Sequence, residues 1–308
     1  MATVREHKME TGSSAINTTN AEAYESTHVH AVYEAIAPHF SSTRHSPWPR
    51  VAAYLEAQNP GSIGLDVGCG NGKYLDVNPT LHVLGSDRSN ELVRLARSRG
   101  SSAISNPKGV ELHASQNNNN TSISEADSRI CTSGGNEVAV ADGLALPYRL
   151  GAFDFVICIA VVHHLSTRER RVEAIGELLS RLRPSQATAS SGPPGTTPRC
   201  GADAVKETVD VETKTHRGES ANKATGLVFV WALEQASSRR GWDEGSEQDT
   251  LVPWVMRAKG RPNETFQRYY HLYKKGELEE DIVAAGGVIE ESGYERDNWW
   301  AVFSRPQL

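Results

Sequence analysis

The chain has 308 residues and a net charge of −6, with 32 basic and 38 acidic residues. This balance excludes a generally basic nucleic-acid coat, so any RNA contact must come from a local patch. The polar start has no apolar signal core, and the longest apolar run, Phe155 to Val162, is too short to cross a bilayer. The four cysteines have no metal-ligand spacing, which favours free thiols in a reducing compartment. We expect a soluble protein of the cytoplasm, and also of the nucleus.

Composition divides the chain into folding and non-folding parts. Residues 1–22 are expected to form a disordered tail, and residues 23–308 a single domain. Inside that domain, residues 100–135 are rich in Ser and Asn, and residues 185–225 combine Ser, Gly and Pro with mixed charges. Neither segment has apolar periodicity, so burial cannot offset its ordering entropy. We interpret both as low-complexity insertions.

Apolar patterning predicts alternating strands and helices elsewhere. The predicted helices are Tyr24–Pro38, Trp48–Gln58, a short piece at Tyr74–Asp76, Glu91–Ser98, Thr167–Leu182 and Lys275–Ala285. The predicted strands are Ile63–Val67, His82–Ser86, Val138–Ala141, Phe153–Ile159, Leu227–Trp231, Val288–Glu291 and Trp299–Phe303. A long loop separates Trp231 from the last helix, and four arginines are expected on the polar side of helix Thr167–Leu182: Arg170, Arg171, Arg181 and Arg183. This alternation predicts an α/β, Rossmann-like fold with a mostly parallel seven-stranded sheet and an antiparallel last strand.

A glycine-rich turn follows the first predicted strand. Asp66 stands just inside that strand, and Gly68, Gly70 and Gly72 follow in the pattern D-x-G-x-G-x-G. Glycines let the backbone adopt positive φ and approach a ligand closely. An acid before the turn suits a cationic ligand end better than the pyrophosphate of a dinucleotide. S-adenosylmethionine, which carries an ammonium and a sulfonium, is such a ligand.

Two further acids end the next two strands. Asp87 follows His82–Ser86, where a ribose diol is usually held, and Asp142 follows Val138–Ala141. Each alone is equally explained as a cap or turn residue. Three strand-end acids in order predict a class I S-adenosylmethionine-dependent methyltransferase. The candidate cofactor-binding residues are Asp66, Gly68, Gly70, Asn71, Asp87, Arg88, Asp142, Gly143, Leu144 and Ala160.

Other polar and aromatic residues fall at the carboxyl ends of later strands, where open α/β sheets bind their ligands. His163 and His164 follow the fourth strand, and Trp231 and Glu234 end the fifth. His163 is equally explained as a satisfied loop histidine, and Trp231 as core packing, whereas His164 is expected to be exposed in the cleft. The candidate catalytic and acceptor-binding residues are Arg44, His163, His164, Trp231, Glu234, Arg239 and Arg240. Methyl transfer needs no nucleophile triad, because a carboxylate acceptor is already ionised and only has to be oriented.

The chain resembles the eukaryotic tRNA methyltransferases that esterify the carboxymethyl group of a modified wobble uridine. The resemblance includes the glycine turn but rests mainly on more specific strings: His28-Val-His-Ala-Val-Tyr33, Ile159-Ala-Val-Val-His-His164, Val230-Trp-Ala-Leu-Glu-Gln235 and Arg268-Tyr-Tyr-His-Leu-Tyr273. It implies S-adenosylmethionine as donor, 5-carboxymethyluridine or its 2-thio form as acceptor, and a small zinc-containing activator subunit. Relatives that add an iron-dependent oxygenase of the AlkB type carry iron ligands. This chain has no His-x-Asp pair, so it resembles the stand-alone fungal form.

Alternatives remain at this point. A small-molecule O-methyltransferase would use the same cofactor half, and a catalytically silent scaffold would keep the same fold. For the activator, we expect contact through edge strand 137–141, because an edge without proline is open to pairing. Coverage of that edge by the chain's own residues 100–135 is the competing interpretation.

Overall fold

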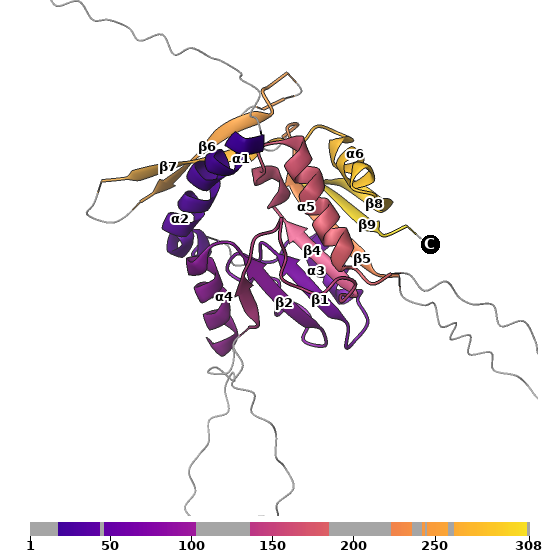
Figure 1. Ribbon diagram of the computed structural model, residues 1–308. Coiled ribbons are helices and arrows are strands. Elements are labelled where there is room, and N and C mark those ends of the chain that lie inside the picture. The colour runs from indigo at the N-terminus through magenta and orange to yellow at the C-terminus, as the bar shows by residue number, and fades with distance from the viewer. Residues whose placement is uncertain are drawn as a thin grey trace, which may run out of the picture.

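The structure is a computed structural model, and it describes residues 18–43, 46–102, 136–184, 223–235, 242–243, 245–257 and 262–306. A central twisted sheet carries helices on both faces, and a separate two-stranded hairpin lies beside the N-terminal helices (Figure 1). The sequence-predicted insertions lie almost wholly outside the described residues. No helix within the described ranges is both long and apolar enough to cross a membrane.

The sheet has seven strands in the order β3-β2-β1-β4-β5-β9-β8. Neighbouring strands from β3 to β5 are parallel, whereas β9 runs antiparallel to both β5 and β8. This confirms the predicted fold class. The strands are β1 (Ile63–Val67), β2 (His82–Asp87), β3 (Val138–Val140), β4 (Phe155–Ile159), β5 (Thr225–Trp231), β8 (Val288–Glu295) and β9 (Asn298–Ser304).

The described helices follow the predicted order with three differences. Helix α1 starts at Thr18, inside the segment expected to be a tail, and α4 continues to Ser102, inside an expected insertion. Residues Tyr74–Asp76 form turns and not a helix. The helices are α1 (Thr18–Glu25), the π-helix η1 (Ser26–His30), α2 (Ala31–Ser41), α3 (Pro49–Glu56), α4 (Asn90–Ser102), the 3-10 helix η3 (Val162–His164), α5 (Arg168–Arg181) and α6 (Glu277–Ala284).

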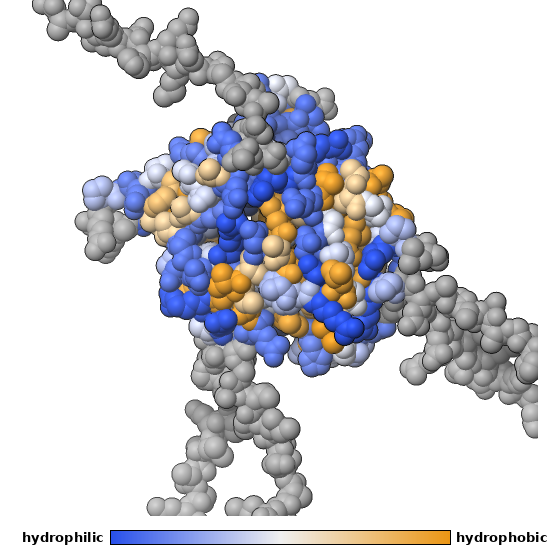
Figure 2. All heavy atoms as spheres, viewed as in Figure 1, coloured by the Kyte–Doolittle hydropathy of each residue, from blue (hydrophilic) through white to orange (hydrophobic). Residues whose placement is uncertain are grey.

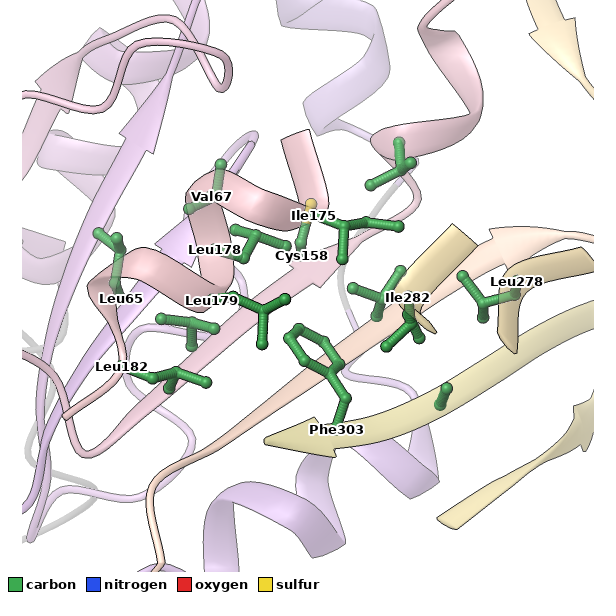
Figure 3. Packing of buried hydrophobic residues seen from close by; sticks show 14 of the residues in the cluster. Leu65, Val67, Cys158, Ile175, Leu178, Leu179, Leu182, Leu278, Ile282 and Phe303 are labelled. Carbon is green, nitrogen blue, oxygen red and sulfur yellow. The ribbon is translucent and has the colours of Figure 1, made fainter. Parts of the chain in front are cut away.

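The strands at the centre of the sheet are buried on both faces, as their continuous apolar sequence predicts. Alternate residues of a strand point to opposite faces. On one face, Val156 and Cys158 of β4 join the cluster formed by α5 and α6 (Figure 3). On the other face, Phe155 and Ile157 join Leu55 of α3. This core holds the carboxyl ends of β1, β2 and β4 in fixed positions.

The structure has a hairpin of β6 (Asp249–Met256) and β7 (Glu264–His271) where the sequence predicts a long loop. Pro253 lies within β6, and proline lowers the expectation of a strand to an edge position. The structure agrees with an edge: the two strands pair only with each other among the described residues. The pairing brings β7 beside η1 and η3.

The prediction of arginines on the polar side of α5 was wrong for Arg170, Arg171 and Arg181, whereas Arg183, just after the helix, is exposed as expected. Arg171 and Arg181 are buried, at 4% and 7% exposure, and Arg170 pairs with the buried Glu25. Arg183 pairs with Asp154. Arg170 and Arg171 tie α5 to α1 and α6, and Arg181 binds a carboxylate of its own helix and the carbonyl oxygen of Tyr148. These three guanidinium groups do not form a basic surface for RNA. Thr167 does cap the helix, since its hydroxyl accepts from Arg170 N.

Candidate active site

A pocket of about 190 Å³ lies at the carboxyl ends of β1, β2 and β4. Its wall includes the glycine turn, residues of η1 and α2, and the strand ends at Ala141–Leu144 and Ile159–Val162. Apolar residues are visible between α2 and α5 on the face that Figure 2 presents. One end of the pocket is lined by backbone and carboxylates, and the other by aromatic rings. These are called the cofactor end and the acceptor end below.

The turn at the cofactor end depends on glycine at position 68. Gly68 has φ of +71°, which is rare for a residue with a side chain. A Cβ atom there would lie 2.3 Å from Cγ2 of Val161, which follows β4. The turn therefore presses against the neighbouring strand end and leaves its backbone open to the pocket.

Asp66 is buried directly beneath this turn. The residue is 1% exposed, and neither carboxylate oxygen has a hydrogen-bond partner in the described residues. Burial raises the pKa of Asp66 to about 8, while the charge of Lys73 opposes the shift. A buried carboxyl group without a partner is costly, and a cationic ligand end above the turn would stabilise its charged form. Asp66 does not itself line the pocket.

Asp87 connects the turn to the end of β2. Its Oδ2 accepts from Gly70 N at 2.9 Å, and its Oδ1 accepts from Ser89 N at 2.9 Å. Burial raises the pKa of this carboxyl, and those backbone N–H groups oppose the shift. Each oxygen keeps a lone pair that can accept from a ligand hydroxyl. Asp87 therefore has the geometry and the acceptors for a ribose diol.

Arg88 and Asp142 form an ion pair at the pocket wall. The pair joins the loop after β2 to the loop after β3. Asp142 also accepts from Leu144 N at 3.0 Å through its other oxygen. Both partners are about one-third exposed, so solvent screens the pair. All the predicted cofactor residues line this pocket except Asp66: Gly68, Gly70, Asn71, Asp87, Arg88, Asp142, Gly143, Leu144 and Ala160.

Ala160 is strained at the end of β4. Its φ of +62° lies in the left-handed region, which residues other than glycine seldom occupy. Its N–H donates to Phe229 O on β5 at 2.9 Å, so the strand pairing holds this conformation. Strained backbone is concentrated at functional sites, and here it turns the chain from β4 into η3.

The acceptor end is organised by His164. Its Nδ1 donates to the carbonyl oxygen of Tyr269 at 2.8 Å, so in the neutral ring Nε2 must accept, from Tyr33 Oη at 2.9 Å. Tyr270 Oη lies 3.2 Å from Tyr33 Oη and donates to it in this network. Burial lowers the pKa of His164 to about 3, so the ring is neutral at physiological pH. The expectation that His164 is exposed was wrong, since it is 7% exposed and both ring nitrogens are used.

Aromatic rings form the rest of the acceptor end. Trp231 stacks on Tyr270 with ring centroids 4.4 Å apart, and both line the pocket. His163 also stacks on Tyr270, with ring centroids 4.9 Å apart. It is fully buried and does not line the pocket. Its Nδ1 accepts from Trp231 N at 3.0 Å. Burial, and then the neighbouring His164, hold the pKa of His163 well below its usual value, so it is neutral.

Four other sequence-predicted residues are not brought to this pocket by the described structure. Glu234 accepts from Trp299 Nε1 and from Lys275 N, both at 3.2 Å, and does not line the pocket. Arg44, Arg239 and Arg240 lie outside the described residues. They stay predictions from the sequence.

Sequence reasoning did not select Tyr33 and Tyr270 as site residues, although both line the pocket. Each lies in a string that carried the family resemblance, His28–Tyr33 and Arg268–Tyr273. Those strings could have indicated them, but only the unpredicted β6–β7 hairpin places the two hydroxyls together.

Comparison with known proteins identifies the family of the chain. A methyltransferase-domain family model matches residues 65–187. The tRNA (carboxymethyluridine(34)-5-O)-methyltransferases of Saccharomyces cerevisiae and Schizosaccharomyces pombe are 36% and 37% identical to the chain. The alignments cover 90% and 91% of this chain, and 95% and 96% of those proteins.

A longer mammalian relative matches as well. The mouse tRNA (carboxymethyluridine(34)-5-O)-methyltransferase ALKBH8 is 33% identical over 91% of this chain, which corresponds to 44% of the mouse protein. The predicted relation to the methyltransferase part of AlkB-homologue enzymes is thereby confirmed. The chain belongs to the tRNA (carboxymethyluridine(34)-5-O)-methyltransferase family, whose members depend on S-adenosylmethionine.

Proposed function

We propose that this protein transfers a methyl group from S-adenosylmethionine to the carboxylate of 5-carboxymethyluridine, or of its 2-thio form, at the wobble position of tRNA. The observation that carries the proposal is one pocket with a carboxylate-rich cofactor end and an aromatic acceptor end, in a chain of this family. The residues at the cofactor end fit the donor. The orphaned Asp66 carboxyl suits its cationic end, and Asp87 has free lone pairs for its ribose.

When bound, with its cationic end near Asp66 and its ribose at Asp87, the donor would supply an activated methyl group on a sulfonium. Transfer to a carboxylate oxygen would leave a neutral thioether and a neutral ester. The carboxylate is ionised at neutral pH, so no general base is required. The neutral, doubly hydrogen-bonded His164 agrees with this, because it has no free nitrogen to take a proton. The role of the chain is to align the two reactants and to exclude water.

The decisive experiment analyses tRNA nucleosides by mass spectrometry. In a strain that lacks this gene, we expect carboxymethyluridine to accumulate at the wobble position and its methyl ester to disappear. The purified chain, with its activator, should then restore the ester on that tRNA when labelled S-adenosylmethionine is added. An unchanged nucleoside profile in the deletion strain would favour the small-molecule methyltransferase instead.

A small zinc-containing activator subunit is proposed to bind the edge strand β3. Gly85 N of β2 donates to Glu137 O, and Ala141 N donates to Asp87 O of β2. The backbone groups of Glu137 and Ala141 that form these bonds therefore point toward β2. Strand groups alternate in direction, so the backbone groups of Val138 and Val140 point away from β2. The guanidinium of Arg97 already donates to Val138 O, which lies on this outer side together with Val138 N. An added strand could therefore pair along this edge.

The change Val138→Pro tests the activator interface, because it removes one outward N–H without removing a bond to β2. We expect co-purification with the activator to be lost while the isolated chain stays folded. The matched control Val138→Thr keeps the N–H and the branched side chain, and should keep the complex. A proline variant that still forms a full-strength complex would rule out this edge.

The protein is proposed to act in the cytoplasm and also in the nucleus. The supporting observation is the absence of paired cysteines in the described part of the chain, where Cys69 and Cys158 are buried free thiols. Fractionation of cells that express the tagged protein tests this, and recovery in a secretory fraction would contradict it.

A further inference from the structure

Arg268 of β7 is a buried cation at the acceptor end. The residue is 2% exposed. Its guanidinium carbon lies 4.7 Å from the ring centroid of Trp254 and 5.2 Å from that of Tyr270. Cation–π contacts with these rings stabilise the charge but supply no hydrogen-bond acceptor for the N–H groups.

Arg268 has no carboxylate partner among the described residues. The other buried arginines do: Arg171 pairs with Glu277 and Asp281, and Arg181 with Glu177. Among the described residues, Arg268 donates from Nη1 to Tyr33 Oη at a long 3.4 Å, and its Nε is buried without a partner. Burying an unpaired charge costs several kcal/mol in general. A bound anion would therefore stabilise the charged form of Arg268.

The anion would have to arrive from the pocket. Tyr33 and Tyr270 line the pocket. Arg268 does not line it but contacts both tyrosines. The Tyr33 hydroxyl donates to His164, so toward Arg268 it is only an acceptor. A carboxylate is a much stronger acceptor than a phenol oxygen and can take two parallel N–H bonds from one guanidinium. It would displace the long contact to Tyr33.

Other cations near the pocket are committed elsewhere. Arg88 pairs with Asp142 at the cofactor end. Lys73 lies over the rings of Trp48 and Tyr74, 4.9 and 4.5 Å from their centroids. The histidines at the acceptor end are neutral: burial comes first, and the charge of Arg268 also lowers the pKa of His163 and His164. Within the described residues, the positive charge at this end comes from Arg268.

We propose that Arg268 binds the acceptor carboxylate and sets the preference of the enzyme for carboxymethyluridine over its neutral methyl ester. This rests on the proposed function and deepens it. Methyl transfer converts the carboxylate to a neutral ester, so the bond to Arg268 weakens at the moment of reaction. The same residue then favours both capture of the substrate and release of the product.

The test compares the affinities of the full chain, with its activator, for two anticodon stem-loop RNAs in the presence of S-adenosylhomocysteine. One RNA carries carboxymethyluridine and the other its methyl ester. We expect wild type to bind the acid about ten- to a hundred-fold more tightly than the ester, the range of a hydrogen bond to a charged group. Arg268→Gln should bring the two affinities to within about threefold of each other. Arg268→Lys, which keeps a charge but not the planar fork, should give an intermediate ratio.

Arg50→Gln is the matched control, because Arg50 also lies over a tryptophan, Trp300, at 4.0 Å, but contacts Trp300 and Glu291, which do not line the pocket. It should keep the wild-type ratio. Affinity for the cofactor product should be unchanged in every variant, which shows that each is folded. An Arg268→Gln variant that binds S-adenosylhomocysteine but keeps the wild-type ratio of acid to ester affinity would overturn the assignment of Arg268 and leave the proposed function standing. Wild type that fails to methylate the acid RNA would overturn the proposed function, and this assignment with it.

Discussion

The two ends of the pocket are built in different ways. The cofactor end comes from short-range structure, since Asp66, Gly68, Gly70 and Asp87 lie within twenty-two residues and on two adjacent strands. The acceptor end joins Tyr33 to Tyr270, which are 237 positions apart. It depends on segments outside the seven-stranded sheet. These are η1 and α2, which precede β1 in the chain, and the β6–β7 hairpin, which lies between β5 and β8 in the chain. The first end is thus fixed by the parallel core, and the second by how the added segments attach.

Buried polar groups attach these segments. Glu25, at the end of α1, is fully buried and accepts from Ser166 N at 2.7 Å and from Arg170 Nη2 at 2.8 Å. His271, at the end of β7, lies between Asp249 and Glu277, at 2.9 and 2.7 Å. Apolar contacts alone would allow such segments to shift, whereas hydrogen-bonded charges fix one position. Changes at these groups should therefore damage the acceptor end first.

The largest effect is expected for Glu25→Ala. It leaves Arg170 and the Ser166 N–H without their acceptor in a buried site, which costs about 3–5 kcal/mol of unfolding free energy. Denaturant titration measures that loss. If the two ends are as separate as the contacts indicate, the variant should lose tRNA methylation while it still binds S-adenosylmethionine.

Glu22→Ala is the control for that change, because Glu22 is exposed on the same helix. Its effect should stay within about 0.5 kcal/mol. Equal losses in the two variants would mean that helix propensity, and not the buried carboxylate, explains the result.

Asp87→Ala should affect the other end. We expect S-adenosylmethionine affinity to fall by about 1.5–3 kcal/mol, or roughly ten- to a hundred-fold in Kd. Calorimetry measures this, with the exposed Asp76→Ala as control. The variant should keep its discrimination between acid and ester RNA. Unchanged affinity in a folded variant would remove the ribose assignment.

His271→Asn should give a smaller and pH-dependent loss. Burial lowers the pKa of His271, but the hydrogen bonds that its ring donates to Asp249 and Glu277 outweigh this and raise the pKa. A raised folded pKa means that the stabilisation is complete below the unfolded value of about 6.5 and is lost as pH rises through the folded value. Because the Asp249 side chain is 60% exposed, we expect only about 1 kcal/mol.

Unfolding of wild type and variant at about pH 6 and about pH 9 measures this difference. Wild type should exceed the variant more at the lower pH. The lower limit of the window is set by the carboxyl groups of Asp249 and Glu277, whose pKa values are lowered, so their contribution is lost only in stronger acid. A gap that widens with rising pH would contradict the charged triad.

The difference between the two ends also explains what the sequence could predict. Strand, turn and acid follow one another within the cofactor end, so a pattern such as Asp66 to Gly70 already implies its geometry. The acceptor end offers no such local pattern. The proline in β6 obscured the hairpin, and only its pairing turns Arg268 toward Tyr33. The prediction failed at Arg170 and Arg171 of α5 for the same reason, because their partners, such as Glu25 and Asp281, lie far away in the sequence.

The smallest effect is expected when residues 185–222 are replaced by a flexible linker of about eight residues. Arg183 N donates to Phe153 O, and Thr225 N donates to Asp154 O, so both flanks of the segment are bound to consecutive residues. A short linker can therefore join them without moving β5. The new loop has about a quarter of the original length, so the entropic free energy of closing it is about 1 kcal/mol smaller. The free energy of unfolding should therefore rise slightly or stay the same. Both ends of the pocket should keep their affinities. A large fall in melting temperature would instead mean that the removed segment contributes to the core of the domain.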